Sequence, residues 1–157
     1  MSAVEDRLAA LGLTVPEVVP PVAAYTPALI DGSRVYVSGQ LPMRDGALVA
    51  TGQVGEGEGL VDPATAKDAA EACALNVIAA IKSVAGDLDR VERIVKVVGF
   101  VASDPSFTGQ PGVVNGASEL LGKAFGDKGV HARSAVGVVA LPLGAAVEVE
   151  AIAHLRD

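Results

Sequence analysis

The stretch from Val91 to Ala102 constrains the fold of this chain most. Its sequence is Val-Glu-Arg-Ile-Val-Lys-Val-Val-Gly-Phe-Val-Ala, a nearly continuous apolar run with partial strand alternation. Such a run is typical of a central strand that is covered on both faces. It is followed by Ser103-Asp104-Pro105 and is shorter than the roughly 18 apolar residues that would indicate a membrane span. We therefore predict a fold built around one buried strand, with no membrane partner.

Three further segments have strand patterns. Residues Ala28 to Gly39 predict a β-hairpin around an Asp31-Gly32 turn. Ser134 to Leu141 and Ala146 to Leu155 predict two more strands, joined by a Pro142-Leu143-Gly144 turn. In the last strand Val147, Val149, Ala151 and Ala153 alternate with Glu148, Glu150, Ile152 and His154, so the two sets are expected on opposite faces.

Helical spacing is found in three places. Val4 to Leu11 predicts a short helix that ends at Gly12. Asp62-Pro63 predicts the start of a helix of about six turns that ends near Gly86. Val113 to Phe125 predicts another. Cys73 lies on the apolar stripe of the long helix, where a buried hydrophobic role is far commoner than a reactive thiol.

The segment from Leu41 to Gly59 has the composition of a long surface loop. It contains the glycine-rich run Gly55-Glu-Gly-Glu-Gly59. The two glutamates would repel an anion, and no phosphate-binding lysine follows the run. We therefore predict a loop and no phosphate site.

The element order, strands, helix, strand, helix, strands, predicts an α+β fold with a mixed sheet and two helices on one sheet face. We expect an N-terminal extension over residues 1–22 and one domain over residues 23–157. A sheet this apolar would leave a large hydrophobic patch on its uncovered face. We therefore expect the chain to self-associate through this uncovered sheet face.

Charge and cysteine content narrow the partners and the compartment. The 157 residues carry a formal net charge of −7, which disfavours nucleic acid as a partner. The single cysteine cannot form an intrachain disulfide, and charged residues occupy positions 5–7, where a signal peptide would be apolar. We therefore expect a cytoplasmic protein.

No residue spacing in the chain has the form of a catalytic motif. His131 and His154 are far apart in sequence, and no cluster has metal-ligand spacing, so we expect neither a metal nor a cofactor. A nucleophile pair of Ser134 and His131 lacks the recognisable turn that would support it. Arg133, at the start of an apolar strand, has two interpretations: a solvated or ion-paired strand end, or a receptor for a carboxylate. Composition does not decide between them.

Four short motifs resemble the landmarks of the Rid/YjgF family, in the family's order. They are Ser38-Gly39-Gln40-Leu41-Pro42, Ala132-Arg133-Ser134, Leu141-Pro142 and Val147-Glu148-Val149-Glu150-Ala151. The resemblance covers the chain from about Tyr25 to its end. It implies a chorismate-mutase-like subunit in a homotrimeric barrel, with the sheets inside and the helices outside.

The resemblance also implies an activity. The best-known branch of the family hydrolyses 2-imino acids and their enamines to 2-keto acids and ammonia. By this resemblance Arg133 and Glu148 are the catalytic residues: Arg133 binds the substrate carboxylate and Glu148 orients the attacking water. The implied substrate-binding residues are Tyr25, Ser38, Gly39, Asn115, Arg133, Ser134 and Ala135.

Other interpretations stay open. Tyr25 could only pack beside the proline segment, Ser38 could cap a strand, Asn115 could hold a loop, and Glu148 could be an ordinary outward residue. Ala135 stands where the deaminases usually carry cysteine. The same cleft could bind a small carboxylate metabolite without turnover, or be filled by the 41–59 loop. The ribonuclease activity linked to the family name is disfavoured by the negative charge.

Overall fold

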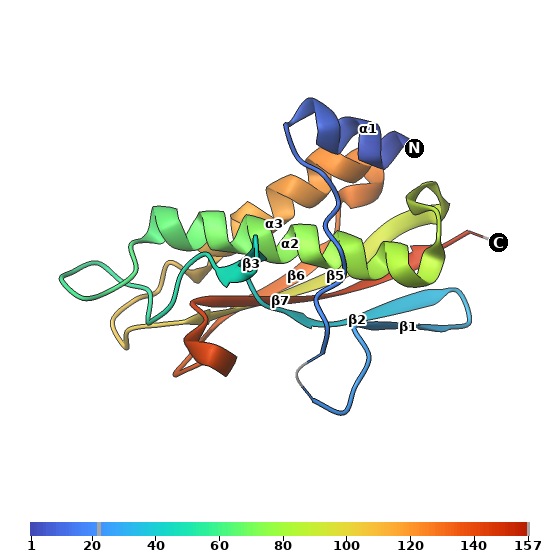
Figure 1. Cartoon of the computed structure of the whole chain (residues 1–157). Coiled ribbons are helices and arrows are strands. Elements are labelled where there is room, and N and C mark those ends of the chain that lie inside the picture. The colour runs from blue at the N-terminus through green and yellow to red at the C-terminus, as the bar shows by residue number, and fades with distance from the viewer. Residues whose placement is uncertain (22, 157) are drawn as a thin grey trace.

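Five strands form one mixed sheet in the order β1-β2-β7-β5-β6 (Figure 1). The computed structural model describes residues 1–21 and 23–156. The strands of the sheet are β1 (Ala28–Asp31), β2 (Arg34–Gln40), β5 (Val91–Ala102), β6 (Ala132–Val138) and β7 (Val147–Leu155). The α-helices are α1 (Ala3–Ala10), α2 (Pro63–Ala85) and α3 (Gln110–Phe125). The described residues also form three short 3-10 helices, η1 (Leu88–Arg90), η2 (Gly126–Gly129) and η3 (Pro142–Gly144).

The predicted central strand is confirmed. β5 pairs with β6 in parallel and with β7 antiparallel. Its residues Ile94, Val97 and Val101 are fully buried against the helices. Both α2 and α3 lie over this face of the sheet, which confirms the α+β fold with two helices on one face (Figure 1).

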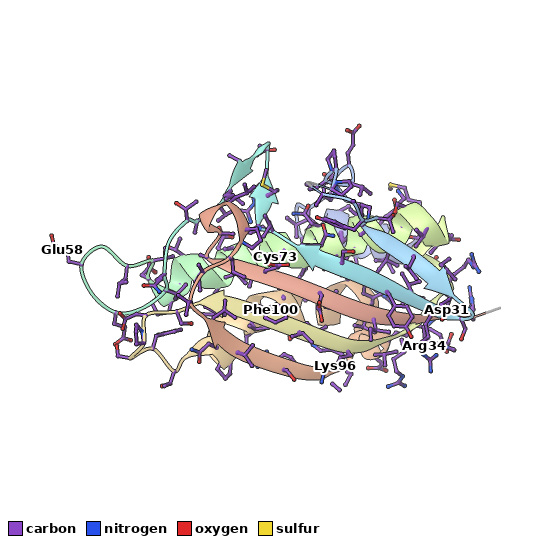
Figure 2. All side chains as sticks on the ribbon, turned by 90° about the horizontal axis from the view of Figure 1, so that it is seen from below. Asp31, Arg34, Glu58, Cys73, Lys96 and Phe100 are labelled. Carbon is purple, nitrogen blue, oxygen red and sulfur yellow. The ribbon has the colours of Figure 1, made fainter. Side chains whose placement is uncertain are left out.

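The opposite face of the sheet carries no α-helix among the described residues. Figure 2 looks onto this open face, where Lys96 and Phe100 project from β5. Leu29, Tyr36 and Val136 belong to the same face, and each is 43–48% exposed. Coverage of β5 on both faces, as its sequence predicts, is therefore not achieved within the described part of this chain.

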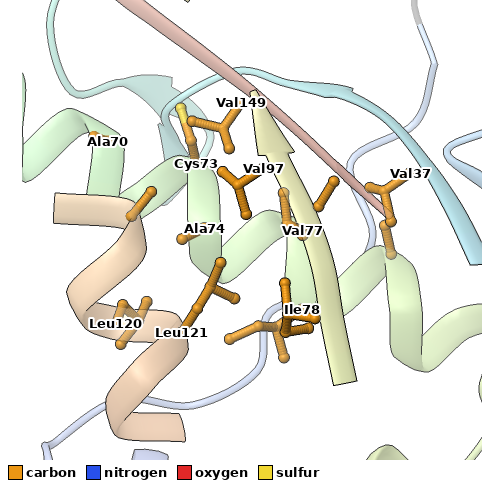
Figure 3. Packing of buried hydrophobic residues seen from close by; sticks show 14 of the residues in the cluster. Val37, Ala70, Cys73, Ala74, Val77, Ile78, Val97, Leu120, Leu121 and Val149 are labelled. Atoms are coloured by element: carbon orange, nitrogen blue, oxygen red, sulfur yellow. The ribbon is translucent and has the colours of Figure 1, made fainter. Parts of the chain in front are cut away.

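The long helix α2 forms as predicted because both ends are specified locally. Asp62 caps it by accepting a hydrogen bond from the Thr65 amide at 3.0 Å, and Pro63 follows in the first turn. Its alanine-rich side packs closely on the sheet (Figure 3). Cys73 is fully buried there beside Val149, and burial raises the pKa of its thiol well above the usual range. The prediction of a buried structural cysteine is confirmed.

α2 and α3 approach each other closely at Gly116. A Cβ atom added to Gly116 would lie 2.0 Å from the backbone oxygen of Lys67 on α2. We predict that Gly116→Ala lowers the free energy of unfolding by about 1–3 kcal/mol, because backbone cannot move aside as a side chain can. Gly122, on the same helix, has open space around its Cβ position. Gly122→Ala should therefore stabilise the chain by up to about 1 kcal/mol through helix propensity alone.

The free energy of unfolding of both variants is measured by urea denaturation at one protein concentration. Circular dichroism is the signal, because the chain has no Trp to report unfolding by fluorescence. Equal stability of the two variants would contradict the role of Gly116.

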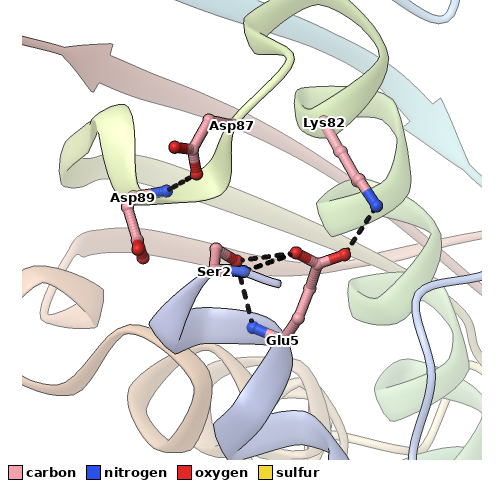
Figure 4. A network of polar contacts seen from close by, with 5 residues as sticks. All are labelled: Ser2, Glu5, Lys82, Asp87 and Asp89. Atoms are coloured by element: carbon pink, nitrogen blue, oxygen red, sulfur yellow. Dashed lines mark hydrogen bonds and ion pairs between the residues drawn. The ribbon is translucent and has the colours of Figure 1, made fainter.

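α1 packs on α3 and buries Leu8 in the main core. A capping box joins Ser2 and Glu5, and Lys82 of α2 donates to Glu5 at 2.6 Å (Figure 4). The Lys82 ammonium and the Ser2 donors lower the pKa of Glu5 to about 2. The expected division between residues 1–22 and 23–157 stays a prediction, and its boundary falls on residue 22, outside the described residues.

Four local predictions need correction. The 41–59 segment is not wholly loop, because β3 (Met43–Arg44) and β4 (Ala47–Leu48) pair around Asp45-Gly46. Both turn residues have positive φ, which is typical of a two-residue hairpin turn. The Asp-Gly pair indicates such a turn, but the overall glycine-rich composition of the segment favoured a loop. The glycine-rich run lies at one end of the molecule, with Glu58 at its tip (Figure 2).

The other three corrections concern boundaries. The first hairpin turns at Gly32-Ser33, because Asp31 pairs with Arg34. α3 begins at Gln110 rather than at Val113, because Pro111 is compatible with a first helical turn. β6 covers 132–138 rather than 134–141, because its partner β5 ends at Ala102 opposite Val138.

Candidate functional site

Arg133 lies on β6, the edge strand of the sheet, and its side chain is held by the first turns of α3. It stands opposite Val97, which faces the helices, so Arg133 is on the helix side of the sheet. Its Nη1 donates to Asn115 Oδ1 at 2.8 Å and to Ser118 Oγ at 3.3 Å. Its Nη2 donates to the backbone oxygen of Pro111 at 3.2 Å. Acceptors on one helix therefore orient the guanidinium.

The donors that remain on Arg133 define what it can bind. A guanidinium has five N–H donors, and the α3 contacts occupy both of those on Nη1 and one on Nη2. The Nε–H and one Nη2–H have no acceptor among the described residues. Two donors from one planar group are what a carboxylate accepts in a bidentate pair. Arg133 makes no ion pair within the described part of the chain, so its charge is available to an anion.

His131 extends this first cluster. Its Nε2 lies 2.8 Å from Ser118 Oγ, and its Nδ1 lies 2.6 Å from the backbone oxygen of Gly129. Ser134, in contrast, is on the open face, where its hydroxyl accepts a hydrogen bond from Lys96 at 3.3 Å. The structure thus pairs His131 with Ser118 and not with Ser134.

A second cluster lies where β2 and β7 adjoin. A Cβ on Gly39 would lie 1.8 Å from Oε1 of Glu148, so only glycine leaves room for the carboxylate in this position. The Ser38 hydroxyl donates to the backbone oxygen of Thr26 at 2.7 Å, which ties down the segment that follows Tyr25. Tyr25 is 47% exposed and lines a hollow of about 80 Å³ together with Gly39. Its other walls include Pro20, Pro21, Leu41, Met43 and Leu143.

The carboxylate of Glu148 is half-buried and has a raised pKa. Burial is the main cause, and the negative charge of Glu150, two residues along the same face, adds to it. No described side chain donates a hydrogen bond to Glu148, and its oxygens are not sealed from solvent. A carboxylate in this setting can accept a hydrogen bond, and then a proton, from a water molecule.

The two clusters do not meet within the described chain. Glu148 stands opposite Phe100 on the open face, whereas Arg133 stands opposite Val97 on the helix face. β5 lies between their two strands. Ala135 shares the helix side with Arg133 and packs against the core. The predicted residues therefore form two groups: Asn115 and Ala135 lie with Arg133, and Gly39 lies against Glu148 with Ser38 and Tyr25 beside Gly39. Ser134 is on the open face and belongs to neither group.

Residues 1–21 and 23–156 offer neither a metal site nor a membrane-spanning helix. No group of three or more His, Cys, Asp or Glu side chains there is placed to hold a metal ion. No helix in the same residues is long and apolar enough to cross a membrane.

Comparison with known proteins gives this arrangement a context. Residues 5–155 match the family model described as "YjgF/chorismate mutase-like, putative endoribonuclease". The chain belongs to the YjgF/chorismate mutase-like family. The resemblance found in the four sequence motifs is thereby confirmed, together with the chorismate-mutase-like fold.

Several relatives of this YjgF-family chain are similar over nearly their whole length. Protein TCP17 of Trypanosoma cruzi is 44% identical, with 98% of this chain and 95% of the relative covered. The Agrobacterium tumefaciens protein Atu1372, whose function is unknown, is 46% identical with a TM-score of 0.90, covering 98% and 93% of the two chains. A Shewanella oneidensis protein that carries the endoribonuclease name is 33% identical with a TM-score of 0.92, covering 99% and 100%.

Sequence reasoning missed two members of the YjgF-type site region. Ser118 contacts Arg133, and its position was readable, because residues 111, 115 and 118 follow the helical spacing of one stripe. Pro111 contributes a backbone oxygen, which no side-chain pattern reveals.

Proposed function

We propose that the chain forms a homotrimer whose inter-subunit clefts hydrolyse small reactive 2-imino acids, and their enamines, to 2-keto acids and ammonia. In this proposal Arg133 binds the substrate carboxylate and Glu148 orients the attacking water. The observation that carries the proposal is the separation of the two clusters onto opposite faces and different strands of one subunit. A second copy can supply the half that each subunit lacks.

The open face of the sheet supports self-association. Its apolar residues are interspersed with polar ones, and β5 has the composition of a strand covered on both sides. Packing the open faces toward a common axis would remove this apolar surface from water, at about 25 cal/mol per Å² of apolar area. The same packing would place the β6 edge of one subunit beside another.

Within such a cleft each group of residues has a distinct proposed task. Asn115 and the backbone around Ser134 and Ala135 would hold the Arg133 end of the substrate. Tyr25, Ser38 and Gly39 would line the end next to Glu148. The small hollow beside Tyr25 is largely apolar, which suits the side chain of a small amino-acid derivative.

The reaction requires little beyond positioning. The water oxygen attacks C2 of the imine while Glu148 accepts one water proton, and the C=N electron pair moves to nitrogen. Glu148 returns its proton to this nitrogen, and the resulting carbinolamine expels ammonia as its hydroxyl proton passes to the departing nitrogen. The net reaction converts R–C(=NH)–COO⁻ and H₂O to R–CO–COO⁻ and NH₃. Because the imine carbon is already electrophilic, a carboxylate clamp and one oriented water are sufficient.

The endoribonuclease name of relatives raises a second activity. A chain with a net charge of −7 has no general attraction for a polyanion, so we do not transfer that activity to this protein. Binding of a keto acid without turnover uses the same Arg133 donors and is an outcome of the test below.

The proposal is tested by following ammonia or 2-ketobutyrate formation from freshly generated 2-iminobutyrate, with and without the purified protein. We expect acceleration above the spontaneous rate and a sedimentation mass of three subunits. Calorimetric binding of 2-ketobutyrate with zero acceleration would replace the enzyme by a binding protein. A monomer that turns over substrate would reject the inter-subunit cleft.

A further inference from the structure

The polar contacts around His131 form a chain that ends on Arg133. The ring lies between two oxygens: the Gly129 backbone oxygen, 2.6 Å from Nδ1, and Ser118 Oγ, 2.8 Å from Nε2. Ser118 Oγ in turn lies 3.3 Å from Nη1 of Arg133. These residues come from η2, the start of β6 and the middle of α3, so tertiary folding brings them together.

The chemistry of the end groups sets the direction of every bond in this chain. A carbonyl oxygen only accepts, so Nδ1 of His131 must carry the hydrogen that it shares with Gly129. In the neutral ring Nε2 then has a lone pair and accepts the hydroxyl hydrogen of Ser118. With its one hydrogen committed, Ser118 Oγ can only accept, and Arg133 can only donate. All bonds therefore run from Arg133 through Ser118 and His131 to Gly129.

The far end of the chain is fixed by close packing. A Cβ on Gly129 would lie 2.3 Å from the backbone oxygen of Leu121, so only glycine allows this approach to the end of α3. Gly129 is buried. The position of the Gly129 carbonyl oxygen is thus fixed. Its hydrogen bond fixes the orientation of the His131 imidazole, which in turn fixes the direction of the Ser118 hydroxyl.

We propose that Ser118 and His131 are positioning residues, which hold the Arg133 guanidinium so that its Nε–H and one Nη2–H are free for a carboxylate. Asn115 and Ser118 take both hydrogens of Nη1 and remove that nitrogen from competition for the ligand. The hydroxyl of an unanchored serine would instead rotate toward a carbonyl of its own helix. The consequence for ligand affinity rests on the proposed function, whereas the bond directions do not.

The bond directions are tested by NMR without any ligand. Long-range ¹H–¹⁵N spectra of histidine-labelled protein distinguish the protonated ring nitrogen from the bare one. In the neutral ring we expect His131 to be protonated at Nδ1 and bare at Nε2, and a proton on Nε2 alone would overturn the chain. The Nε–H signal of Arg133, assigned by its loss in Arg133→Lys, should be sharp and should broaden in Ser118→Ala.

Ligand affinity supplies the functional test. Ser118→Ala should raise the Kd for 2-ketobutyrate about 5- to 10-fold, and His131→Phe about 3-fold, because one charge-assisted bond is lost or loosened. Ser118→Thr keeps the hydroxyl and should remain within about 2-fold of the parent chain. Ser83→Ala is the matched control, because Ser83 also lies on a helix and donates to a backbone oxygen, that of Ala80.

The two proposals fail separately. Absence of any 2-ketobutyrate binding by the parent chain would reject the carboxylate clamp. The NMR signals of His131 and Arg133 would still show whether the hydrogen bonds run from Arg133 through Ser118 and His131 to Gly129. An unchanged Arg133 Nε–H signal in Ser118→Ala, in a variant whose circular dichroism shows an intact fold, would reject the positioning role.

Discussion

Arg133→Ala should lower kcat/KM for 2-iminobutyrate by about 10²–10⁴-fold, because two charge-assisted hydrogen bonds to the carboxylate, each about 1.5–3 kcal/mol, are removed together. KM should rise with little change in kcat if Arg133 binds the carboxylate equally in the ground state and the transition state. The value of kcat should also fall if Arg133 sets the angle at which water attacks. Steady-state kinetics on substrate generated in the cuvette measures both.

Arg133→Lys is the matched control for this prediction. Lysine keeps the positive charge but not the planar fork, so it should recover only part of the lost activity. The thermal stability of Arg133→Ala should change little, because its partner Asn115 is exposed to solvent. A kcat/KM equal to that of the parent chain would assign Arg133 an ordinary role at a strand end.

Glu148→Gln should lower kcat by about 10²-fold, because the amide of glutamine cannot accept a proton from water. The same change should raise the free energy of unfolding at neutral pH. The pKa of Glu148 is raised above 4.5 in the folded chain, so the folded state binds more protons than the unfolded state between 4.5 and the raised pKa. Stability therefore falls as pH rises through that interval, and the ionised carboxylate remains costly above it.

The dependence of kcat on pH distinguishes the role of Glu148 from that of its neighbour Glu150. Activity should fall as pH drops through the raised pKa of Glu148, because the protonated carboxyl cannot accept a proton. Glu150→Gln, two residues along the same face, removes one cause of that shift and should move the acidic limb of kcat to lower pH without abolishing turnover. A Glu148→Gln variant with full activity and an unchanged profile would exclude Glu148 from the chemistry.

Periodicity and cap chemistry predicted most of the fold because they act over short stretches of chain. The alternation in Val147 to Leu155 placed Glu148 and Glu150 on one face, and the structure agrees. Asp62-Pro63 and Gly86 marked the ends of α2. The prediction was wrong where it relied on overall composition and not on the turn residues. In the 41–59 segment, Asp45-Gly46 forms the turn of a short hairpin.

The candidate site was harder to predict because its contacts join distant segments. Asn115 and Arg133 were named together only through the family resemblance, and the 2.8 Å bond between them needs α3 to cross the end of β6. The contact between Ser118 and His131 has no spacing signature, since 13 residues and a helix end separate them. The backbone oxygens of Pro111 and Gly129 have no sequence signal at all.

The acidic α+β fold, the buried central strand and the open sheet face are encoded in the order of residues, because apolar periodicity and charge can be read along the chain. The placement of Arg133 and Glu148 on opposite faces, with β5 between their strands, emerges only when the sheet is assembled. Strand order and register are set by packing between remote segments, and no local pattern encodes them. The same packing decides which donors of Arg133 remain free.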